Sequence, residues 1–545
     1  MPTLTRGSFA HGATSLSLKT GDWRLQRPQH RHKAAPCATE CPAGENPQAY
    51  IAKVAEDDLR GAWETLVAAN PLPAITGRVC HHPCERGCNR GSFDQPIAIH
   101  NLERFLGDRA IDERWNYPIN TPSPDAPQVA VVGAGPAGLS AAYHLIRRGF
   151  WVTLFDAEPE PGGLLRSALP PYRLPREVLN REVERLLAVG IVFKPTHRIG
   201  RDISIDELRA DFPGVFLAPG TSRAREWTID GVVPSDLRTG LDLLREWNSI
   251  GALPEYNRVA IIGGGNTAID LARVMRFMGV EEVHLITFQR LPGPGVRPKD
   301  AMSATSREIA QALEEGVKIH EARGVRRLIM RGDTVVGVEV VHMKELDHHG
   351  RREPVAFEGT ETILKVDQVI PAIGQQLDAA TFGRALTLPG VFVGGDARMA
   401  GGTVSGAIGD GRRAAIAIQN YLEGLPEDVA VPLRSIAFNE LNVNYFEHAP
   451  RVQAPLLAVE QRCADAEIEG ALSQGTIVGE ARRCFSCGKC MSCDNCWTLC
   501  PDNSVLKTER TEDGWQYVFD YDHCKGCGIC AHECPVGFID MVNEP

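Results

Sequence analysis

The sequence has no cysteine between Cys88 and Cys463, although the chain of 545 residues contains 16 of them. The cysteines therefore form two dense groups near the ends of the chain, whereas a disulfide framework would be spread through the cores. Metal ligation in a reducing cytosol is the better interpretation of such groups. We therefore expect metal or cluster chemistry at both ends and a different chemistry in the middle.

Positive charge and long apolar runs are also scarce. The formal net charge is −11, whereas proteins that bind nucleic acids usually carry a basic surface. The sequence contains neither 18 consecutive apolar residues nor an apolar leader at its N-terminus. We therefore expect a cytoplasmic protein that neither binds nucleic acid nor spans a membrane.

A glycine-rich loop opens the middle of the chain. Gly133, Gly135 and Gly138 follow a β-branched run and precede a helical pattern. The next β-branched run ends in Asp156, about 20 residues further on, where a carboxylate can bind a ribose hydroxyl. Glycines allow the tight turn and let a pyrophosphate approach the helix N-terminus. The pattern predicts a dinucleotide-binding βαβ unit; the alternative is a glycine-rich turn without a ligand.

The same design occurs a second time. Gly263, Gly265 and Ala268 follow the run 258–262, with alanine in the third glycine position. A second dinucleotide is therefore predicted, although this loop alone is weaker support than the first.

Several further motifs carry a resemblance to a known family. They are Gly133–Gly138, Pro161–Leu165, Phe216–Thr221, Val369–Gly374 and Gly390–Asp396. In this order they resemble the fingerprints of the glutamate synthase small-subunit family of flavin disulfide-reductase-like proteins, over about residues 23–422. The resemblance implies FAD, with Asp396 at its ribityl–phosphate part and the helix near Arg412 pointing its N-terminus at the flavin. A capping carboxylate in a turn is the alternative for Asp396.

These patterns define the expected cofactor residues and the fold. The cofactor-binding residues are expected to be Gly133, Gly135, Gly138, Asp156, Gly163, Leu164, Gly220, Gly263, Gly265, Asn266, Thr267, Ala268, Arg290, Gly374, Gly395, Asp396 and Thr403. The expected fold is multidomain: an α-helical iron–sulfur domain, two nested Rossmann-like α/β domains and a C-terminal ferredoxin-like α+β domain. The expected boundaries are 1–22 for an arm, 23–122 for the helical domain, 123–224 and 375–422 for the FAD domain, 225–374 for the NAD(P) domain, 423–480 for a connector and 481–545 for the ferredoxin domain.

One departure from the family bears on the nucleotide. Members that use NADPH typically end the second strand of this domain with Tyr-Arg-Arg, whose cations meet the extra phosphate. Here the match reads Thr287, Phe288 and Gln289, followed by Arg290. We therefore expect NAD(H) to be preferred over NADP(H), although Arg290 or Arg297 could reach a 2′-phosphate.

The C-terminal cysteines give the strongest pattern. Two runs of the form C-x2-C-x2-C-x3-C-P match the bacterial ferredoxin pattern, in which the fourth cysteine binds the other cluster. One [4Fe–4S] cluster is thus expected on Cys490, Cys493, Cys496 and Cys534, and the other on Cys524, Cys527, Cys530 and Cys500. Structural zinc does not need the terminal C-x3-C-P. Cys484 and Cys487 extend the first run, either as part of a shifted ligand set or as spare thiols.

The N-terminal cysteines are harder to assign. Position by position, the resemblance places Cys41, Cys80, Cys84 and Glu103 on one cluster. A second family cluster needs a C-x-x-C pair upstream of Cys37, which the sequence lacks, so Cys37 and Cys88 have too few partners. We expect one N-terminal cluster, with a second left open; Glu103 could instead be a solvated helical carboxylate. The nearby His81 and His82 are expected at the surface.

Together these patterns predict an NAD(P)H oxidoreductase subunit. A nicotinamide exchanges two electrons as a hydride and a cluster exchanges one, and a flavin can do both. We expect no catalytic side chain, because the chemistry takes place at the flavin. Disulfide reduction is excluded, because the Cys-x4-Cys pair of the disulfide reductases is absent.

Three interpretations of the partner remain. The added ferredoxin module resembles flavoprotein subunits that serve 2-oxoacid:ferredoxin oxidoreductases or dissimilatory sulfite reductase, and soluble ferredoxin is a further acceptor. The alternative is a glutamate synthase small subunit that feeds a glutamine-dependent large chain. A redox sensor with vestigial cofactors is the third interpretation, which the completeness of both glycine loops disfavours.

Overall fold

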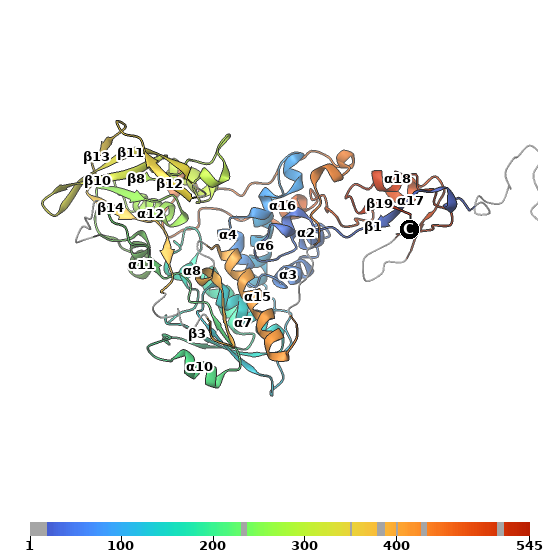
Figure 1. Ribbon diagram of the computed structural model, residues 1–545, viewed down its shortest axis with the longest axis horizontal. Coiled ribbons are helices and arrows are strands. Elements are labelled where there is room, and N and C mark those ends of the chain that lie inside the picture. Colours follow the sequence, from blue (N-terminus) through green and yellow to red (C-terminus); the bar gives the residue numbers. More distant parts are fainter. Residues whose placement is uncertain are drawn as a thin grey trace, which may run out of the picture.

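The structure is a computed structural model that describes residues 19–229, 237–348, 351–378, 387–398, 402–426, 433–508 and 517–544. Most of the expected N-terminal arm lies outside these residues. Figure 1 shows the C-terminal module at one end, the helical domain beside it and the two α/β domains beyond. No helix of the described residues combines the length and the apolar character needed to cross a bilayer.

The helical domain is a bundle of short helices. Asn46 and Asp58 cap two of its helices through their side chains, and prolines occupy first-turn positions of four of them, where the missing N–H costs nothing. The helices are α1 (Pro36–Thr39), α2 (Pro47–Ala55), α3 (Leu59–Val67), α4 (Pro73–Val79), α5 (Pro83–Arg86), η3 (Asn89–Ser92) and α6 (Ile99–Asp112).

The first α/β domain contains a five-stranded parallel sheet in the order β16-β5-β2-β3-β4. Its strands are β2 (Gln128–Val132), β3 (Trp151–Phe155), β4 (Ile191–Lys194), β5 (Val215–Leu217) and β16 (Val391–Val393). Its helices are α7 (Pro136–Arg147), α8 (Leu164–Ser167), α9 (Arg176–Leu187), α10 (Ile205–Asp211), η6 (Gly395–Ala397) and α15 (Val404–Glu423). Because β16 follows the second α/β domain in sequence and still joins this sheet, the predicted nested arrangement of the fold is confirmed.

The second α/β domain has a parallel sheet in the order β14-β7-β8-β9 and an antiparallel sheet against it. The parallel strands are β7 (Arg258–Ile262), β8 (Glu282–Ile286), β9 (Lys318–His320) and β14 (Gln368–Pro371), and the antiparallel ones are β10 (Arg323–Arg331), β11 (Thr334–His348), β12 (Arg351–Ala356) and β13 (Thr362–Leu364). The helices are α11 (Gly240–Ile250), α12 (Asn266–Phe277), η4 (Pro298–Asp300) and α13 (Ser306–Glu314). The short strands β6 (Arg223–Ala224) and β15 (Gln375–Gln376) pair where the chain enters and leaves this domain.

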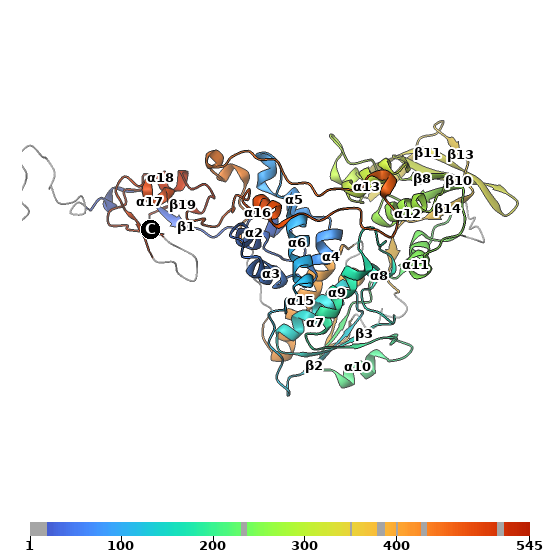
Figure 2. The same ribbon diagram turned by 180° about the vertical axis from the view of Figure 1, so that it is seen from behind.

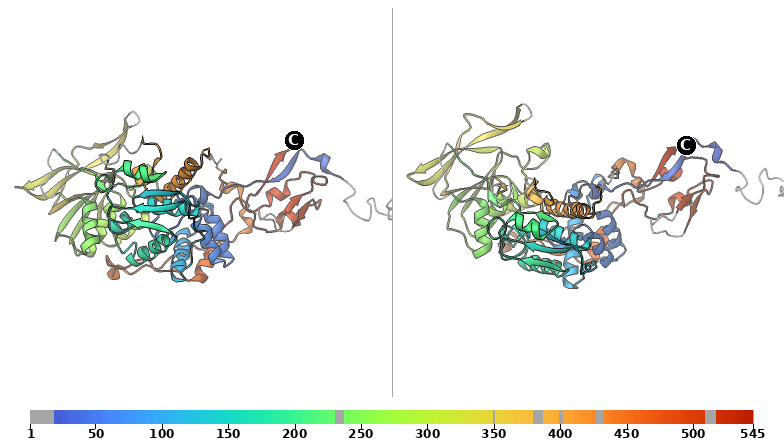
Figure 3. Two further views of the ribbon diagram at one scale, coloured as in Figure 1. Left: turned by 90° about the horizontal axis from the view of Figure 1, so that it is seen from below. Right: turned by 60° about the horizontal axis from the view of Figure 1, so that its bottom comes forward.

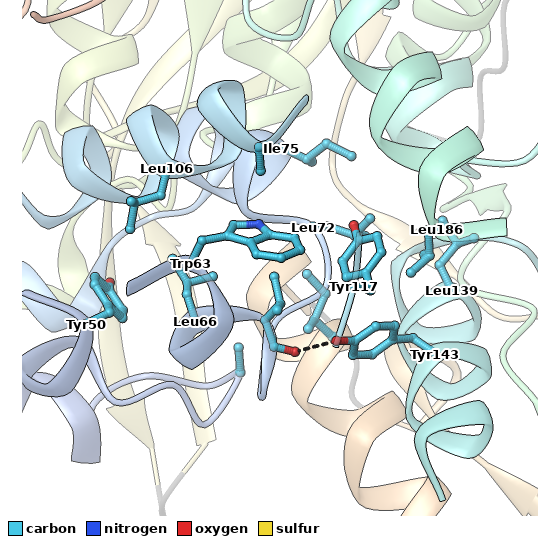
Figure 4. Close-up of a cluster of buried hydrophobic side chains, with 14 of the residues drawn as sticks. Tyr50, Trp63, Leu66, Leu72, Ile75, Leu106, Tyr117, Leu139, Tyr143 and Leu186 are labelled. Atoms are coloured by element: carbon cyan, nitrogen blue, oxygen red, sulfur yellow. Dashed lines mark hydrogen bonds between the residues drawn. The ribbon is translucent and has the colours of Figure 1, made fainter. Parts of the chain in front are cut away.

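The helical domain and the first α/β domain share one apolar core. Figure 4 shows Trp63 and Tyr117 beside Leu139 and Tyr143 of α7, and the Tyr143 hydroxyl donates to the backbone oxygen of Val67 at 2.9 Å. All of these side chains are almost completely buried. Burying such aromatic side chains stabilises a contact by about 1.5–3 kcal/mol each, so the two domains pack as one unit.

The C-terminal module incorporates a strand from the other end of the chain. Strand β1 (Gln26–His30) pairs antiparallel with β19 (Ile539–Asn543). Residues 26–30, which we expected in the helical domain, therefore complete this sheet, as Figure 3 shows. The other elements of this end are η2 (Gly21–Trp23), α16 (Gln474–Ala481), α17 (Asn495–Thr498), β17 (Val505–Lys507), β18 (Tyr517–Phe519) and α18 (Ile529–His532).

The expected connector is a long excursion across the molecule (Figure 2). It has short 3-10 turns at η7 (Phe438–Glu440), η8 (Val443–Tyr445) and η9 (Val459–Gln461). Ala464 and Ile468 enter the core of the second α/β domain, and Arg462 forms ion pairs with Glu314 and Glu315 of that domain. The chain then returns to α16, which packs on α2. The connector thereby ties both α/β domains to the helical domain.

Candidate cofactor sites

The first glycine loop joins β2 to α7 and has no room for a side chain at Gly133 or Gly138. A Cβ at Gly138 would lie 1.7 Å from the Gly133 oxygen, and Gly133 itself has φ +99°. Gly135 is the N-cap of α7 without a side-chain hydrogen bond, so the first N–H groups of this helix stay available for a phosphate. This loop therefore fits a dinucleotide pyrophosphate.

Asp156 lies at the end of β3, as predicted, and is held by backbone donors. Its carboxylate accepts from the Ala134 N–H at 2.5 Å and the Glu158 N–H at 2.8 Å. Burial raises its pKa. The expected Gly163 packs against the loop, because a Cβ there would lie 2.9 Å from the Gly135 Cα, and Leu164 begins α8 next to it.

The second FAD motif lies across the same sheet edge. Gly395 has φ +64°, and a Cβ there would lie 2.9 Å from the Ala137 Cβ of α7. Asp396 is half-buried, and burial raises its pKa. No residue of the described ranges forms a hydrogen bond with its carboxylate. A half-buried acceptor of this kind fits the hydroxyls of a ribityl chain. Gly220, the other expected glycine, has φ +65°.

One residue that holds this motif was missed in the sequence. Asp410 of α15 is buried and accepts from the Gly395 N–H at 2.7 Å, and it also pairs with Arg398 and Arg413. It fixes the turn that carries Asp396. A carboxylate in the glycine-rich, otherwise uncharged segment 402–411 was the available signal.

Helix α15 connects the flavin site to the cysteines. Thr403 caps its N-terminus by accepting from the Gly406 N–H at 3.1 Å. In the same turn the Ser405 hydroxyl lies 3.4 Å from the Cys80 Sγ. A Cβ at Gly409 would lie 2.0 Å from the Pro42 oxygen, next to Cys41. The turn expected to face the flavin is thus in contact with the helical domain.

The second glycine loop joins β7 to α12. A Cβ at Gly263 would lie 2.3 Å from the Ala372 oxygen, and Gly265 is an N-cap without a side-chain hydrogen bond. Asn266 and Thr267 form the first turn of α12, and Ala268 is buried beneath it. These features fit a second pyrophosphate.

The amide of Asn266 also reaches the helical domain. Its Nδ2 lies 2.7 Å from His81 Nε2, and its Oδ1 accepts from the Thr305 N–H at 3.2 Å. His81 is partly buried, and its neighbour His82 is buried, whereas we expected both at the surface. Gly374, at the exit from this domain, has φ +106° and accepts from the Arg225 N–H.

The end of β8, where the two ribose phosphates would be distinguished, is polar and uncharged. Thr287 is buried and Gln289 half-buried, and a Cβ at Gly264 would lie within 2.7 Å of both side chains. The side chains of Arg290 and Arg297 are exposed, and Arg297 pairs with Asp300 at 2.6 Å.

The expected N-terminal ligands gather in one buried place. Burial, followed by the charge of Glu103, raises the pKa of Cys80 to about 12. Burial and neighbouring acidic groups likewise raise the pKa values of Cys41 and Cys84. The thiolates of Cys80 and Cys41 raise the pKa of Cys84 further. Glu103 is buried, not solvated; it accepts from Asn70 Nδ2 at 3.0 Å and from the Thr76 hydroxyl. Burial raises its pKa well above the usual range.

The C-terminal cysteines surround two separate hollows. One is lined by Cys500, Cys524, Cys527 and Cys530, and the other by Cys490, Cys493, Cys496 and Cys534. In each set, three cysteines come from one run and the fourth from the other run. Four thiols divided in this way are the donor set that a cubane cluster of the ferredoxin type needs.

Single-ion ligation fits these cysteines less well. Among the described residues, no group of three or more His, Cys, Asp or Glu side chains is arranged to hold one metal ion. Thiolates of a zinc site lie about 2.3 Å from a common centre. The ligands of a four-iron cubane surround a larger body and therefore lie farther apart.

The remaining cysteines were unassigned in the sequence, and the structure separates them. Cys463 is exposed. Cys484 and Cys487 do not line either C-terminal hollow. They lie with Cys37 and Cys88, to which we return below.

Comparisons with known proteins agree with this division. A model of the pyridine nucleotide-disulphide oxidoreductase family matches residues 127–411. A model described as dihydropyrimidine dehydrogenase domain II, 4Fe-4S cluster, matches residues 29–115, and a 4Fe-4S binding domain matches residues 517–540.

Curated relatives match most of the chain. The NADP(+)-dependent formate dehydrogenase subunit beta of Moorella thermoacetica is 33% identical over 83% of this chain and 70% of its own length. The NADPH-Fe(3+) oxidoreductase subunit beta of Geobacter sulfurreducens is 32% identical over 85% of this chain and 77% of its own. The glutamate synthase [NADPH] small chain of Azospirillum brasilense is 31% identical over 72% of this chain and 87% of its own.

Proposed function

The chain belongs to the pyridine nucleotide-disulphide oxidoreductase family. From that premise we propose which of its residues bind a nicotinamide nucleotide, which bind FAD and which hold iron–sulfur clusters. The protein is a FAD-dependent NAD(P)H:iron–sulfur oxidoreductase subunit, as predicted. When bound, FAD supplies the exchange between a two-electron hydride and single electrons. The side chains described above bind and orient the two nucleotides and hold the clusters.

We assign FAD to the first glycine loop, with Asp156 at the adenosine ribose and Asp396 at the ribityl chain. NAD(H) is assigned to the second loop and α12. The contact that supports the electron route best is that of Ser405 with Cys80, 3.4 Å between Oγ and Sγ. It joins the first turn of the flavin-facing helix directly to a proposed cluster ligand. Electrons leaving the flavin thus have a short path into the cluster on Cys41, Cys80, Cys84 and Glu103.

An anaerobic titration tests this route. The reconstituted protein is reduced stepwise with NADH while the flavin and cluster absorbances are followed. We expect the flavin to bleach and the clusters to follow it, together with rapid turnover of a viologen dye. Flavin reduction that never reaches the clusters would contradict the proposed route, and failure of both to respond would contradict the nucleotide assignment.

For the nucleotide we propose a preference for NADH. The neutral side chains of Thr287 and Gln289 follow β8, and neither can pair with a 2′-phosphate as an arginine would. All three relatives above carry NADP in their names, so this chain would differ from them. We expect kcat/KM to be at least about tenfold higher for NADH. The variant Gln289→Arg should move the ratio toward NADPH, with Gln375→Arg, on β15, as a control that leaves it unchanged. A wild-type preference for NADPH would contradict the proposal.

For the partner we propose a catalytic subunit that receives or supplies electrons through the C-terminal module. The relatives are named as subunits of a formate dehydrogenase, an iron(III) oxidoreductase and a glutamate synthase. A 2-oxoacid:ferredoxin oxidoreductase, a dissimilatory sulfite reductase and soluble ferredoxin remain the candidates from the sequence. The extra ferredoxin module disfavours a glutamate synthase role. Co-purification of the partner, and its loss when residues 481–545 are removed, would test the proposal.

A further inference from the structure

Four cysteines from opposite ends of the chain lie together beside the N-terminal cluster site. We propose that Cys37, Cys88, Cys484 and Cys487 ligate a further [4Fe–4S] cluster, half from the helical domain and half from the start of the C-terminal module. Neither iron–sulfur family model reaches residues 484–487, since they match 29–115 and 517–540. The inference concerns a route that rests on the proposed function, but its test counts iron and does not depend on turnover.

The helical domain brings Cys37 and Cys88 together. Cys37 lies in α1, and Cys88 lies between α5 and η3. The ends of α1 and α5 touch, because a Cβ at Gly87 would lie 2.8 Å from the Glu40 Cγ and 3.6 Å from the Pro36 oxygen. This contact brings the segment of Cys88 close to Cys37.

The returning chain is held against these two helices. The Arg90 guanidinium donates to the Arg483 backbone oxygen at 2.7 Å, and Asn89 Nδ2 lies 3.6 Å from the Cys487 Sγ. Phe485, between the two cysteines, is buried against Phe93. A short C-x2-C segment is thereby fixed beside the other two thiols.

The electrostatics show that the four thiols are mutual neighbours. Burial, followed by the thiolates of Cys484, Cys88 and Cys487, raises the pKa of Cys37 well above its usual range. Burial and the thiolates of Cys487 and Cys88 raise the pKa of Cys484 to about 12, and burial and Cys88 raise that of Cys487 to about 11. Cys37 and Cys487 are buried and the other two are partly buried, so these thiols are costly to ionise. Cluster iron offsets this cost by binding the thiolates as their protons leave to solvent.

The surrounding donors suit thiolate ligands. The Asn89 amide approaches Cys487, and the Ser486 N–H donates to the Cys484 Sγ at 3.5 Å. Such hydrogen bonds to sulfur are one of the means by which proteins tune cluster potentials. The upstream C-x-x-C pair that the sequence lacks is thus replaced in space by a C-x-x-C pair from the other end.

The proposed cluster fills the gap in the electron route. Cys37 and Cys41 are four residues apart in sequence, so their Cα atoms lie within about 14 Å, and those of Cys487 and Cys490, three apart, lie within about 11 Å. The cluster would accept one electron from the Cys41 site and pass one electron to the Cys490 site. It would therefore join the flavin-side cluster to the ferredoxin module.

The test is a count of clusters. With four cubanes the holoprotein should contain about sixteen irons and as many sulfides per chain. The double variant Cys484→Ser/Cys487→Ser should contain about twelve, and Cys37→Ser the same twelve. Combining all three changes should remove no more iron, because the residues share one cluster. Cys463→Ser, at an exposed thiol, is the matched control and should keep sixteen.

Other outcomes would overturn the proposal. These are a double variant that keeps all its iron, losses that add when the variants are combined, one zinc in place of four irons, or a disulfide among the four residues. FAD content equal to wild type shows that each variant has folded. If the double variant does not fold, native mass spectrometry of the wild-type holoprotein decides, because three cubanes instead of four contradict the inference.

Discussion

The two cysteine groups of this molecule are built in opposite ways. In the C-terminal module, eight cysteines within residues 490–534 line two hollows. At the N-terminal group, Cys37 and Cys88 meet Cys484 and Cys487 only after the chain has crossed both α/β domains and returned. The first arrangement is set by local spacing, and the second by the packing of whole domains.

This difference determines which substitutions should disrupt each cysteine group. A C-x2-C-x2-C loop brings three thiolates together through its own short length, so it depends little on the rest of the protein. The N-terminal group depends on α15, on the contact between α1 and α5, and on the returning segment at Arg483. We therefore expect distant substitutions to disturb the N-terminal group and to spare the C-terminal module.

The largest expected effect comes from removing a ligand inside the C-terminal module. Cys530→Ser should remove about four irons and lower electron transfer to ferredoxin about a hundredfold or more, while NADH still bleaches the flavin. Because Cys500 lines the same hollow, Cys500→Ser/Cys530→Ser should lose only the same four irons. Cys534→Ser, from the other hollow, is the matched control and should add to the loss. Iron analysis and stopped-flow absorbance provide the measurements.

A substitution in the first glycine loop should affect the two cysteine groups differently. A Cβ at Gly138 would lie 1.7 Å from the Gly133 oxygen, so Gly138→Ala should force the loop to shift and lower the FAD content at least about tenfold. The distortion of α7 and α15 should reduce the iron of the N-terminal group and leave about eight irons in the C-terminal module. Gly479→Ala, at a helical glycine with open space, is the control. Equal loss of iron from both ends would contradict the comparison.

The smallest effect is expected at the contact between the N-terminal segment and the C-terminal module. Lys33 is buried, and its ammonium donates to the Gly537 oxygen at 2.8 Å and to the Asp540 carboxylate at 2.6 Å. Lys33→Met should weaken the docking of the C-terminal module by about 1–3 kcal/mol, because these acceptors lose a charged donor. Hydrogen exchange of β1 and β19 measures the change.

A matched control exists for the Lys33 variant. Lys19→Met removes an exposed pair with Asp522 in the same module, and such pairs contribute little. It should therefore leave the exchange unchanged. If the two variants behave alike, the buried ion pair does not fasten the module.

The features that could be predicted from the sequence are those that depend on local spacing, and the features that could not be predicted depend on the packing of whole domains. The glycine loops, Asp156 and the two ferredoxin runs depend on residues close together in the chain. In the structure, Asp156 lies against the first glycine loop, and the ferredoxin cysteines line two hollows. Glu103 was ambiguous because periodicity shows a helix but not what covers it; in the structure the Asn70 and Thr76 side chains cover it.

The long-range features could not be obtained from spacing. The glycine-rich surroundings of Asp410 single it out but do not indicate that it holds Gly395, and nothing near residues 26–30 indicates that they pair with β19. Cys484 and Cys487 were apparent only as an extension of the ferredoxin run. Their proximity to Cys37 depends on a path of the chain that local patterns do not encode.

The pairing of β1 with β19 has a consequence for biosynthesis. Gln26 meets Asn543, which is 517 residues later in the chain. At roughly 5–20 residues per second, a ribosome needs roughly 25–100 s to make the intervening segment. During that time Cys37 and Cys88 are synthesised but lack half of their companions, so their thiols are open to oxidation. Iron delivery to the proposed site of these cysteines must therefore wait until Cys484 and Cys487 have been made, when most of the chain has already been translated.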